Sequence, residues 1–253
     1  MKMFIPRLEV YPIRLEDNVR FITNYLDPNR QNTTRPFFEK TILLYPELKD
    51  VNDIENGQVR TETIRSAVEN RLEDHKEIIS ARIAYFREKF DSFIYDFIRA
   101  QCELFRYEWQ EDDPVIRCYV GYIPFYPRST EDKCFYVSYQ DEERVFSGAV
   151  HEINHMIFHE KWKQMHPGVN DDENFPHPLW YLEEIIVDPT LNDERVRPYT
   201  LFENKAYPQF YVPNAGETES IMKRVRDCYA NTSNIEDFLN KAYWIVDDWV
   251  KKT

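Results

Sequence analysis

Between residues 60 and 109, apolar residues recur every three or four positions, and neither glycine nor proline interrupts them. This spacing places them on one face of an α-helix. The polar stretch Asp74-His75-Lys76 predicts a break between two helices, and His75 is expected to be solvated there. A stripe of this kind is typical of core packing, so we assign it no catalytic role. The recurring positions are Ile64, Val68, Leu72, Ile79, Ile83, Phe86, Phe90, Phe93, Phe97 and Phe105.

The pattern changes between residues 114 and 140. Two runs, 115–120 and 134–139, are rich in β-branched and aromatic residues, and a proline-containing loop separates them. Such runs predict β-strands. Residues 1–57 contain only short apolar runs broken by Asn, Asp and Pro, which indicates strand or loop with one short helix near 16–26.

Helical patterns return after residue 140. Acidic residues at 141–143 suit the first turn of a helix, because the helix dipole favours negative charge there. Ser233 and Glu236 predict a capping box at the start of the last helix. The expected helices run from 142 to about Met165, from about 179 to 187 with a stop at Pro189, and over about 216–230 and 234–251.

Composition supports a helix-rich α+β chain. Only 5 of the 253 residues are glycine, which is low against the usual share of ~7% and argues for few tight turns. The length allows one large domain or two small ones. We predict a single domain over 1–253, in four parts: a mixed N-terminal segment (1–57), a long helical segment (60–109), a sheet-containing core (114–190), and a loop with C-terminal helices (191–253).

Net charge and cysteine content indicate which classes of partner and which cellular location to expect. The formal net charge of -13 makes the chain a poor candidate for binding nucleic acid, which relies on Lys and Arg, and mainly favours solubility. No segment approaches the ~20 apolar residues of a membrane span, and the N-terminal sequence does not resemble a signal peptide. The four cysteines form no CxxC pair and are expected to be buried thiols. We therefore expect a cytoplasmic protein without a nucleic-acid or membrane partner; its oligomeric state stays open.

The candidate chemistry lies in the helix predicted over 142–165, in the sequence His151-Glu152-Ile153-Asn154-His155. Residues four apart share a helix face, so both imidazoles can reach one Zn²⁺ at about 2.0–2.1 Å. Glu152, about 100° round the helix, lies at the edge of that face, where it can reach a water on the metal and act as general base. An HExxH match arises by chance in roughly one or two such chains in a hundred, so further residues have to support it.

The next predicted helix supplies carboxylates about thirty residues downstream. Glu184 and Asp188 are four apart and share one side with Tyr181, whereas Glu183 is expected to point elsewhere. A histidine that binds a metal normally donates its other N–H to a carboxylate. Asp188 is placed to do this for His151.

HEINH followed by EIIVD resembles the gluzincins, the thermolysin-like zinc metallopeptidases. The resemblance covers about residues 142–190. It implies a zincin-like fold in which a small mixed sheet covers the active-site helix and the glutamate helix follows. It also implies His151, His155 and Glu184 as ligands of one zinc ion, Glu152 as the general base, and Asp188 as a support for a ligand. An edge strand would pair with an extended peptide substrate, and 115–120 and 134–139 are the candidates.

Other histidines fit the site less well. A metzincin would need Gly at 158 and His at 161, where the chain has Phe158 and Lys161. His159 continues the stripe, but it lies one turn beyond the two ligands. His166 and His177 each precede a proline and are expected at the surface, although His177 could line the cleft.

The sequence predicts zinc-dependent hydrolysis of a peptide or protein substrate. The alternative is a zinc-binding regulatory protein that keeps the site without peptidase activity. The pattern leaves open the substrate, endo- versus exo-cleavage, and whether the N-terminal segment covers the cleft. Gly148, inside the predicted helix, suggests a close packing partner or room for substrate. The oxyanion-stabilising donor also stays open among Tyr181, His177, Tyr199, Tyr207 and Tyr211.

Overall fold

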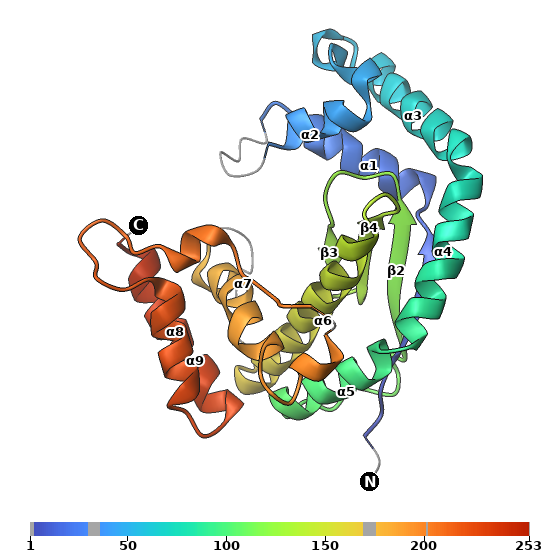
Figure 1. Ribbon diagram of the computed structural model, residues 1–253. Helices are drawn as coiled ribbons and strands as arrows, with labels where there is room; N and C mark the ends of the chain where they lie inside the picture. The colour runs from blue at the N-terminus through green and yellow to red at the C-terminus, as the bar shows by residue number, and fades with distance from the viewer. Residues whose placement is uncertain (1–2, 30–35, 169–175, 201, 253) are drawn as a thin grey trace. The chain divides into compact units, whose positions relative to one another are not determined.

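The structure of the chain is a computed structural model that describes residues 3–29, 36–168, 176–200 and 202–252. It is helix-rich and of the α+β class, with a small mixed sheet of four strands, as predicted (Figure 1). Residues 30–35 of the predicted N-terminal segment lie outside the described residues. The internal contacts divide the chain into two compact units, one formed by 1–7, 93–114 and 149–253 and the other by 8–92 and 115–148. The single-domain prediction stays a prediction.

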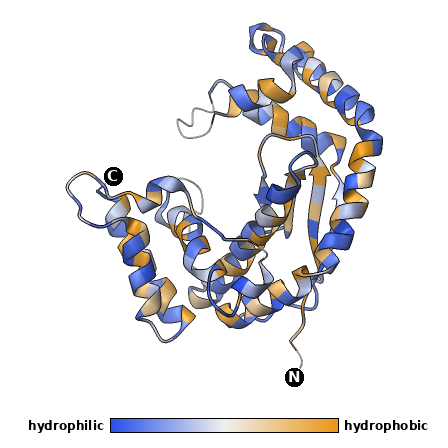
Figure 2. Ribbon diagram, in the orientation of Figure 1, coloured by the Kyte–Doolittle hydropathy of each residue, from blue (hydrophilic) through white to orange (hydrophobic). Residues whose placement is uncertain are grey.

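The sheet has the strand order β1-β2-β4-β3. Strands β2 (Val115–Gly121) and β4 (Cys134–Ser138) correspond to the two predicted runs and pair in parallel, with Cys118 opposite Phe135. Side chains of β2 alternate in burial, and Figure 2 shows the matching alternation of hydrophilic and hydrophobic residues. The edges belong to β1 (Arg7–Pro12) and the short antiparallel β3 (Arg128–Ser129). The prediction that 115–120 or 134–139 forms a substrate-binding edge is therefore wrong, because both strands are central.

Helices accompany this sheet within the same unit. Helix α1 (Leu15–Leu26) packs against α2 (Phe37–Leu44) and α3 (Gly57–Asp74), and α4 (Lys76–Asp91) packs against β2. The short 3-10 turns η1 (Pro46–Leu48) and η2 (Val51–Asp53) link α2 to α3.

The predicted helix break at His75 is confirmed, since α3 ends at Asp74 and α4 begins at Lys76. The solvated environment predicted for His75 is wrong. Its ring is half-buried, hydrogen-bonds the Tyr139 hydroxyl through Nδ1 and meets the Tyr122 ring edge-on. Although His75 lies in a polar stretch of the sequence, its side chain is directed inward, against the buried Tyr122 and Tyr139.

Gly148 lies in α6 (Glu142–Met165), whose predicted bounds are confirmed. A Cβ atom added at Gly148 would lie 2.9 Å from Cδ2 of Tyr126. Because no larger residue fits beside this ring without a shift, the glycine is explained by a close packing partner.

Helices make up most of the other unit. They are α5 (Ile94–Phe105), the α6 residues from Ala149 onward, α7 (Pro178–Leu191), α8 (Ile221–Ala230) and α9 (Ile235–Val250), with 3-10 turns η3 (Arg197–Tyr199) and η4 (Pro208–Tyr211). Helix α7 packs against α5, α8 and α9, and α8 packs against α9.

Three predicted helix ends are wrong in this unit. Helix α8 begins at Ile221, with Ser220 as its cap, and not near residue 216. Helix α7 continues through Pro189 to Leu191. Proline removes only one backbone hydrogen bond, and the side chains around it are buried, so packing outweighs the lost bond. Asn234, not Ser233, caps α9 by accepting a hydrogen bond from the backbone N–H of Asp237 at 2.8 Å.

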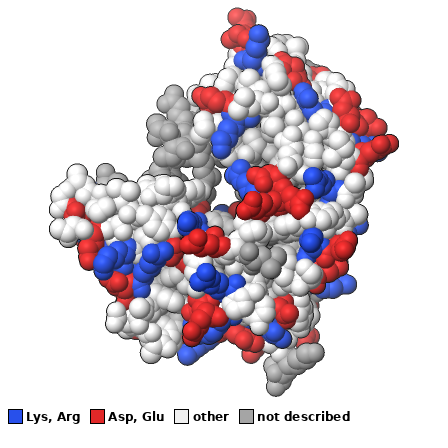
Figure 3. All heavy atoms as spheres, viewed as in Figure 1, with Lys and Arg blue, Asp and Glu red and all other residues white. Residues whose placement is uncertain are grey.

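Acidic and basic side chains are interspersed on the face drawn in Figure 3. Within the described residues, several charged side chains form i,i+4 ion pairs, such as Lys223–Asp227 and Lys241–Asp237. No helix within the described ranges combines the length and apolarity that crossing a membrane requires. The four cysteines are free thiols, three of them buried, and burial raises the pKa of Cys102 to about 12.

Candidate metal centre

Helix α6 presents His151 and His155 on one face, one turn apart, as their spacing predicts. Their Nε2 atoms lie 2.7 Å from each other, and the two rings meet edge to face. Both imidazoles thus turn the same nitrogen toward one point.

Glu184 brings a carboxylate to the same point from α7. Its Oε2 atom lies 3.3 Å from Nε2 of His151 and 3.8 Å from Nε2 of His155. Among the residues that the structure describes, these three form a group whose potential ligand atoms all lie within 4.8 Å of one another. The structure therefore brings together the three predicted ligands from two helices.

The donor set fits zinc. Ligand atoms arranged tetrahedrally at about 2.0–2.1 Å from Zn²⁺ are about 3.3–3.4 Å apart. The separation of 3.3 Å between Glu184 and His151 matches this value, and that of 3.8 Å between Glu184 and His155 is longer by about 0.4 Å. The two histidine nitrogens, 2.7 Å apart, are closer by about 0.6 Å and would have to separate to bind one ion. The side chains of His155 and Glu184 are buried, whereas that of His151 is 26% exposed. Three protein ligands with one accessible side are typical of catalytic rather than structural zinc sites.

Glu152 follows His151 directly on α6 and is buried. Helix geometry places its side chain about 100° round the axis from that of His151, at the edge of the histidine face. Its predicted role as a base stays a prediction.

Glu183, the residue before the predicted ligand, lies against two histidines. Its Oε2 atom is 2.6 Å from Nε2 of His159 and 3.6 Å from Nδ1 of His155. All three side chains are buried. The expectation that Glu183 points away from the site is wrong, because α7 is buried on all sides from Leu182 to Leu191 and has no solvent face there.

Asp188 lies in a different cluster. Arg226 binds it with two hydrogen bonds of 2.7 Å, and the Tyr211 hydroxyl donates a third of 2.6 Å. Both carboxylate oxygens are thereby engaged. Burial, together with the hydrogen bond to Asp188, raises the pKa of Tyr211 to about 12, so the phenol stays protonated and remains a donor. The predicted support of His151 by Asp188 stays a prediction, beside this observed contact with an arginine.

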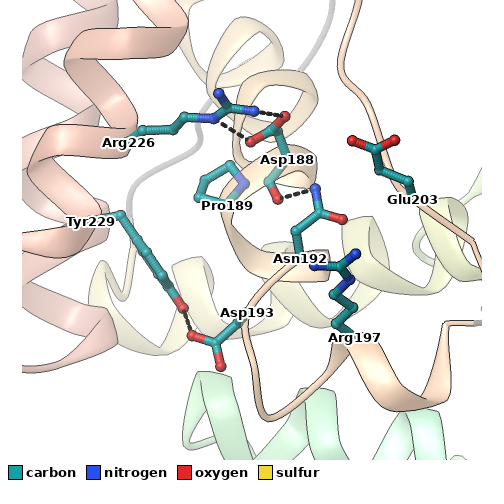
Figure 4. Close-up of a pocket in the computed structure, with 8 residues that line it drawn as sticks. All are labelled: Asp188, Pro189, Asn192, Asp193, Arg197, Glu203, Arg226 and Tyr229. Atoms are coloured by element: carbon teal, nitrogen blue, oxygen red, sulfur yellow. Dashed lines mark hydrogen bonds and ion pairs between the residues drawn. The ribbon is translucent and has the colours of Figure 1, made fainter.

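A polar pocket of about 360 Å³ adjoins this second cluster (Figure 4). Figure 4 shows the Arg226 guanidinium facing the Asp188 carboxylate, with Tyr229 hydrogen-bonded to Asp193 nearby. The pocket is lined by Asp188, Pro189, Asn192, Asp193, Arg197, Glu203, Arg226 and Tyr229.

Two of the candidate oxyanion donors have structural contacts of their own. His177 caps α7 by accepting a hydrogen bond of 3.1 Å at Nδ1 from the backbone N–H of Leu179, and its side chain is half-buried. Tyr211 serves Asp188 and accepts from the backbone N–H of Ala206.

The other three candidates are tyrosines. Tyr181 packs edge-on against Phe210 and Trp249. Tyr207 stacks on Trp180, and Tyr199 lies half-buried in η3. The oxyanion donor stays open among all five candidates.

Buried polar bonds hold α6 against its neighbours. Asn154, which directly precedes His155, accepts hydrogen bonds from Gln101 of α5 and from Thr190 of α7. Lys161, also buried, donates to Glu236 of α9 at 2.6 Å and to the carbonyl of Arg106 at 3.2 Å. These bonds fix the rotation of α6, and with it the direction of the His151 and His155 imidazoles.

Comparisons with known proteins add no family. No family model matches the chain, and no curated protein or solved structure is significantly similar to it. What the site does has to be inferred from its own residues.

Proposed function

We propose that this chain is a zinc-dependent peptidase of the gluzincin type, with a zincin-like arrangement of its metal-binding helices. His151, His155 and Glu184 would hold the ion. The convergence of their three ligand atoms from α6 and α7 is the observation that carries the proposal. Two imidazoles and one carboxylate are a ligand set that peptidases use for catalytic zinc.

Zinc bound there would supply Lewis acidity that activates a water and polarises a peptide carbonyl. The chain's own residues do the rest. Glu152 accepts the proton of the attacking water and later returns it to the leaving amine. The exposed side of His151 leaves an approach for the substrate. A cytoplasmic location and a peptide or protein substrate belong to this proposal as well.

Glu152→Gln tests the proposal most sharply. Glutamine keeps the size of the side chain and cannot accept the proton, so peptide hydrolysis should fall by about 10²–10⁴-fold. Zinc should remain bound at one ion per chain, because Glu152 is not a ligand. Both quantities can be measured on the same preparation, with a fluorogenic peptide library and with metal analysis by mass spectrometry.

Glu160→Gln is the matched control, since Glu160 lies on the same helix away from the ligand group and pairs with Lys163. It should leave both activity and zinc content unchanged. Hydrolysis that survives Glu152→Gln would refute the assigned base. Zinc without hydrolysis by the unchanged protein across a broad library would refute the peptidase and favour a zinc-binding regulatory protein.

A further inference from the structure

The third histidine of α6, His159, lies one turn beyond His155 and takes no part in the ligand group. Its Nε2 atom is 2.6 Å from Oε2 of Glu183, and the two side chains are only 3% and 0% exposed. A carboxylate in such surroundings needs hydrogen-bond donors, because burial of an unsatisfied charge costs several kcal/mol. The histidine supplies one of them.

The same oxygen of Glu183 faces a second imidazole. Nδ1 of His155 lies 3.6 Å from it, which is an electrostatic contact and longer than a hydrogen bond, while Nε2 of His155 is turned to the ligand group. The two nitrogens of one ring thus face a carboxylate and a metal position on opposite sides. When Nδ1 carries the proton and directs it at a carboxylate, Nε2 keeps the lone pair that a metal needs.

We infer that Glu183 and His159 form a positioning pair for His155. The negative charge of Glu183, 3.6 Å from Nδ1, favours the Nδ1–H form of the His155 ring, and the hydrogen bond of 2.6 Å from His159 holds the Glu183 side chain in place. The inference rests on the proposed zinc site. It assigns to Glu183 of α7 a support role toward one ligand, next to Glu184, which is itself a ligand.

A purely structural pair would behave differently. It would stabilise the packing of α6 on α7 and leave zinc affinity unchanged in any variant that folds. A positioning pair also changes the state of the His155 ring. Zinc affinity and ring tautomer are therefore the readouts that separate the two roles.

The experiment compares Glu183→Leu, which removes the acceptor, with Glu183→Gln, which keeps an acceptor of the same size without the charge. His159→Phe tests the outer partner, and Glu160→Gln is the matched control on α6. Zinc affinity of the full chain is measured by competition with a chromogenic chelator, and folding by circular dichroism. Loss of a residue that supports a ligand typically weakens metal binding 10–100-fold.

We expect zinc affinity to fall by about 100-fold in Glu183→Leu and by about 10-fold in Glu183→Gln and in His159→Phe. The control should change it less than about twofold, which lies below that range. If Glu183→Leu does not fold, Glu183→Gln decides the affinity test, since it preserves shape and burial. Folded variants that bind zinc as tightly as the unchanged protein would overturn the inference and leave the peptidase proposal standing.

A second readout does not need the metal. Nitrogen-15 NMR of the histidine rings in the metal-free chain should show His155 as the Nδ1–H tautomer, shifted toward Nε2–H in Glu183→Gln. If the unchanged protein binds no zinc, the proposed function fails, and this measurement still decides the inference. An Nε2–H ring in the unchanged protein would contradict the positioning role.

Discussion

Helix α7 carries buried carboxylates on two successive turns, and the partners of these carboxylates differ. On the first of the two turns, Glu183 and Glu184 face imidazole nitrogens of α6. One turn later, Asp188 faces the guanidinium of Arg226 and the hydroxyl of Tyr211. We call these the histidine end (Glu183 and Glu184) and the arginine end (Asp188).

The difference lies in the permanence of the partner's charge. An arginine is charged at every accessible pH, so it neutralises Asp188 and the pair behaves as a structural salt bridge. An unprotonated imidazole offers a lone pair to a cation, which a guanidinium cannot do. Under the proposed function, the histidine end binds the metal and the arginine end stabilises the fold.

Glu184→Gln should have the largest effect. An amide is a weak zinc ligand, and removal of one of three protein ligands forfeits roughly a quarter to a third of the ~10–16 kcal/mol typical of tight zinc binding. Zinc affinity should therefore fall by about a thousandfold, as measured by chelator competition. Affinity within threefold of the unchanged protein would remove Glu184 from the site.

Asp188→Asn should lower the stability of the fold and leave zinc affinity nearly unchanged. It leaves Arg226 without its carboxylate, and breaking a buried ion pair costs about 3–5 kcal/mol. Because the Arg226 side chain is 53% exposed, we expect only about 2–3 kcal/mol in urea unfolding. Zinc affinity should stay nearly unchanged. A loss of 10–100-fold would show instead that Asp188 supports His151, as the sequence pattern alone predicts.

Glu236→Gln extends the test to a second ion pair, the one between Glu236 and the buried Lys161. Although burial opposes it, the hydrogen bond from Lys161 holds the pKa of Glu236 below its ordinary value. The folded pKa is lowered, so the pair stabilises the protein above pH about 4.3 and loses that effect as pH falls through the lower value.

At pH 7 we expect this variant to lose about 1–2 kcal/mol of unfolding free energy, because Lys161 loses its carboxylate partner. The difference from the unchanged protein should shrink in urea titrations below pH about 4. A difference that is constant with pH would mean that the carboxylate charge does not contribute.

Tyr211→Phe should have the smallest effect. It removes one donor to Asp188 and keeps the two bonds from Arg226, so the loss should be about 1 kcal/mol in unfolding free energy. Zinc affinity should not change. An effect on zinc binding would show that the arginine end and the histidine end of α7 are coupled.

Periodicity predicted the part of the site that depends on single helices. His151 and His155 share a face because they are four apart, and Glu184 follows on a helix whose existence the pattern also shows. It could not predict Glu183, because a helix buried on both sides has no polar face to mark its orientation. Which carboxylate meets which histidine depends on how α6 and α7 pack.

The same limit applies to the fold. Local composition predicted the runs that became β2 and β4, yet their central, parallel placement depends on pairing between distant segments. Pro189 looks like a helix stop in isolation, whereas the buried neighbours of α7 carry the helix past it. Asn and Ser are both favourable N-cap residues, so the sequence alone does not show whether Ser233 or Asn234 caps α9.

Metal analysis of the full chain is the direct test of whether the histidine end holds one zinc ion. The chain is purified in the presence of zinc, freed of excess metal and analysed by mass spectrometry beside a His151→Ala, His155→Ala double variant and Asp188→Asn. We predict one zinc per chain in the unchanged protein and in Asp188→Asn, and none in the double variant. An unchanged protein without zinc, or a double variant that retains it, would contradict the account.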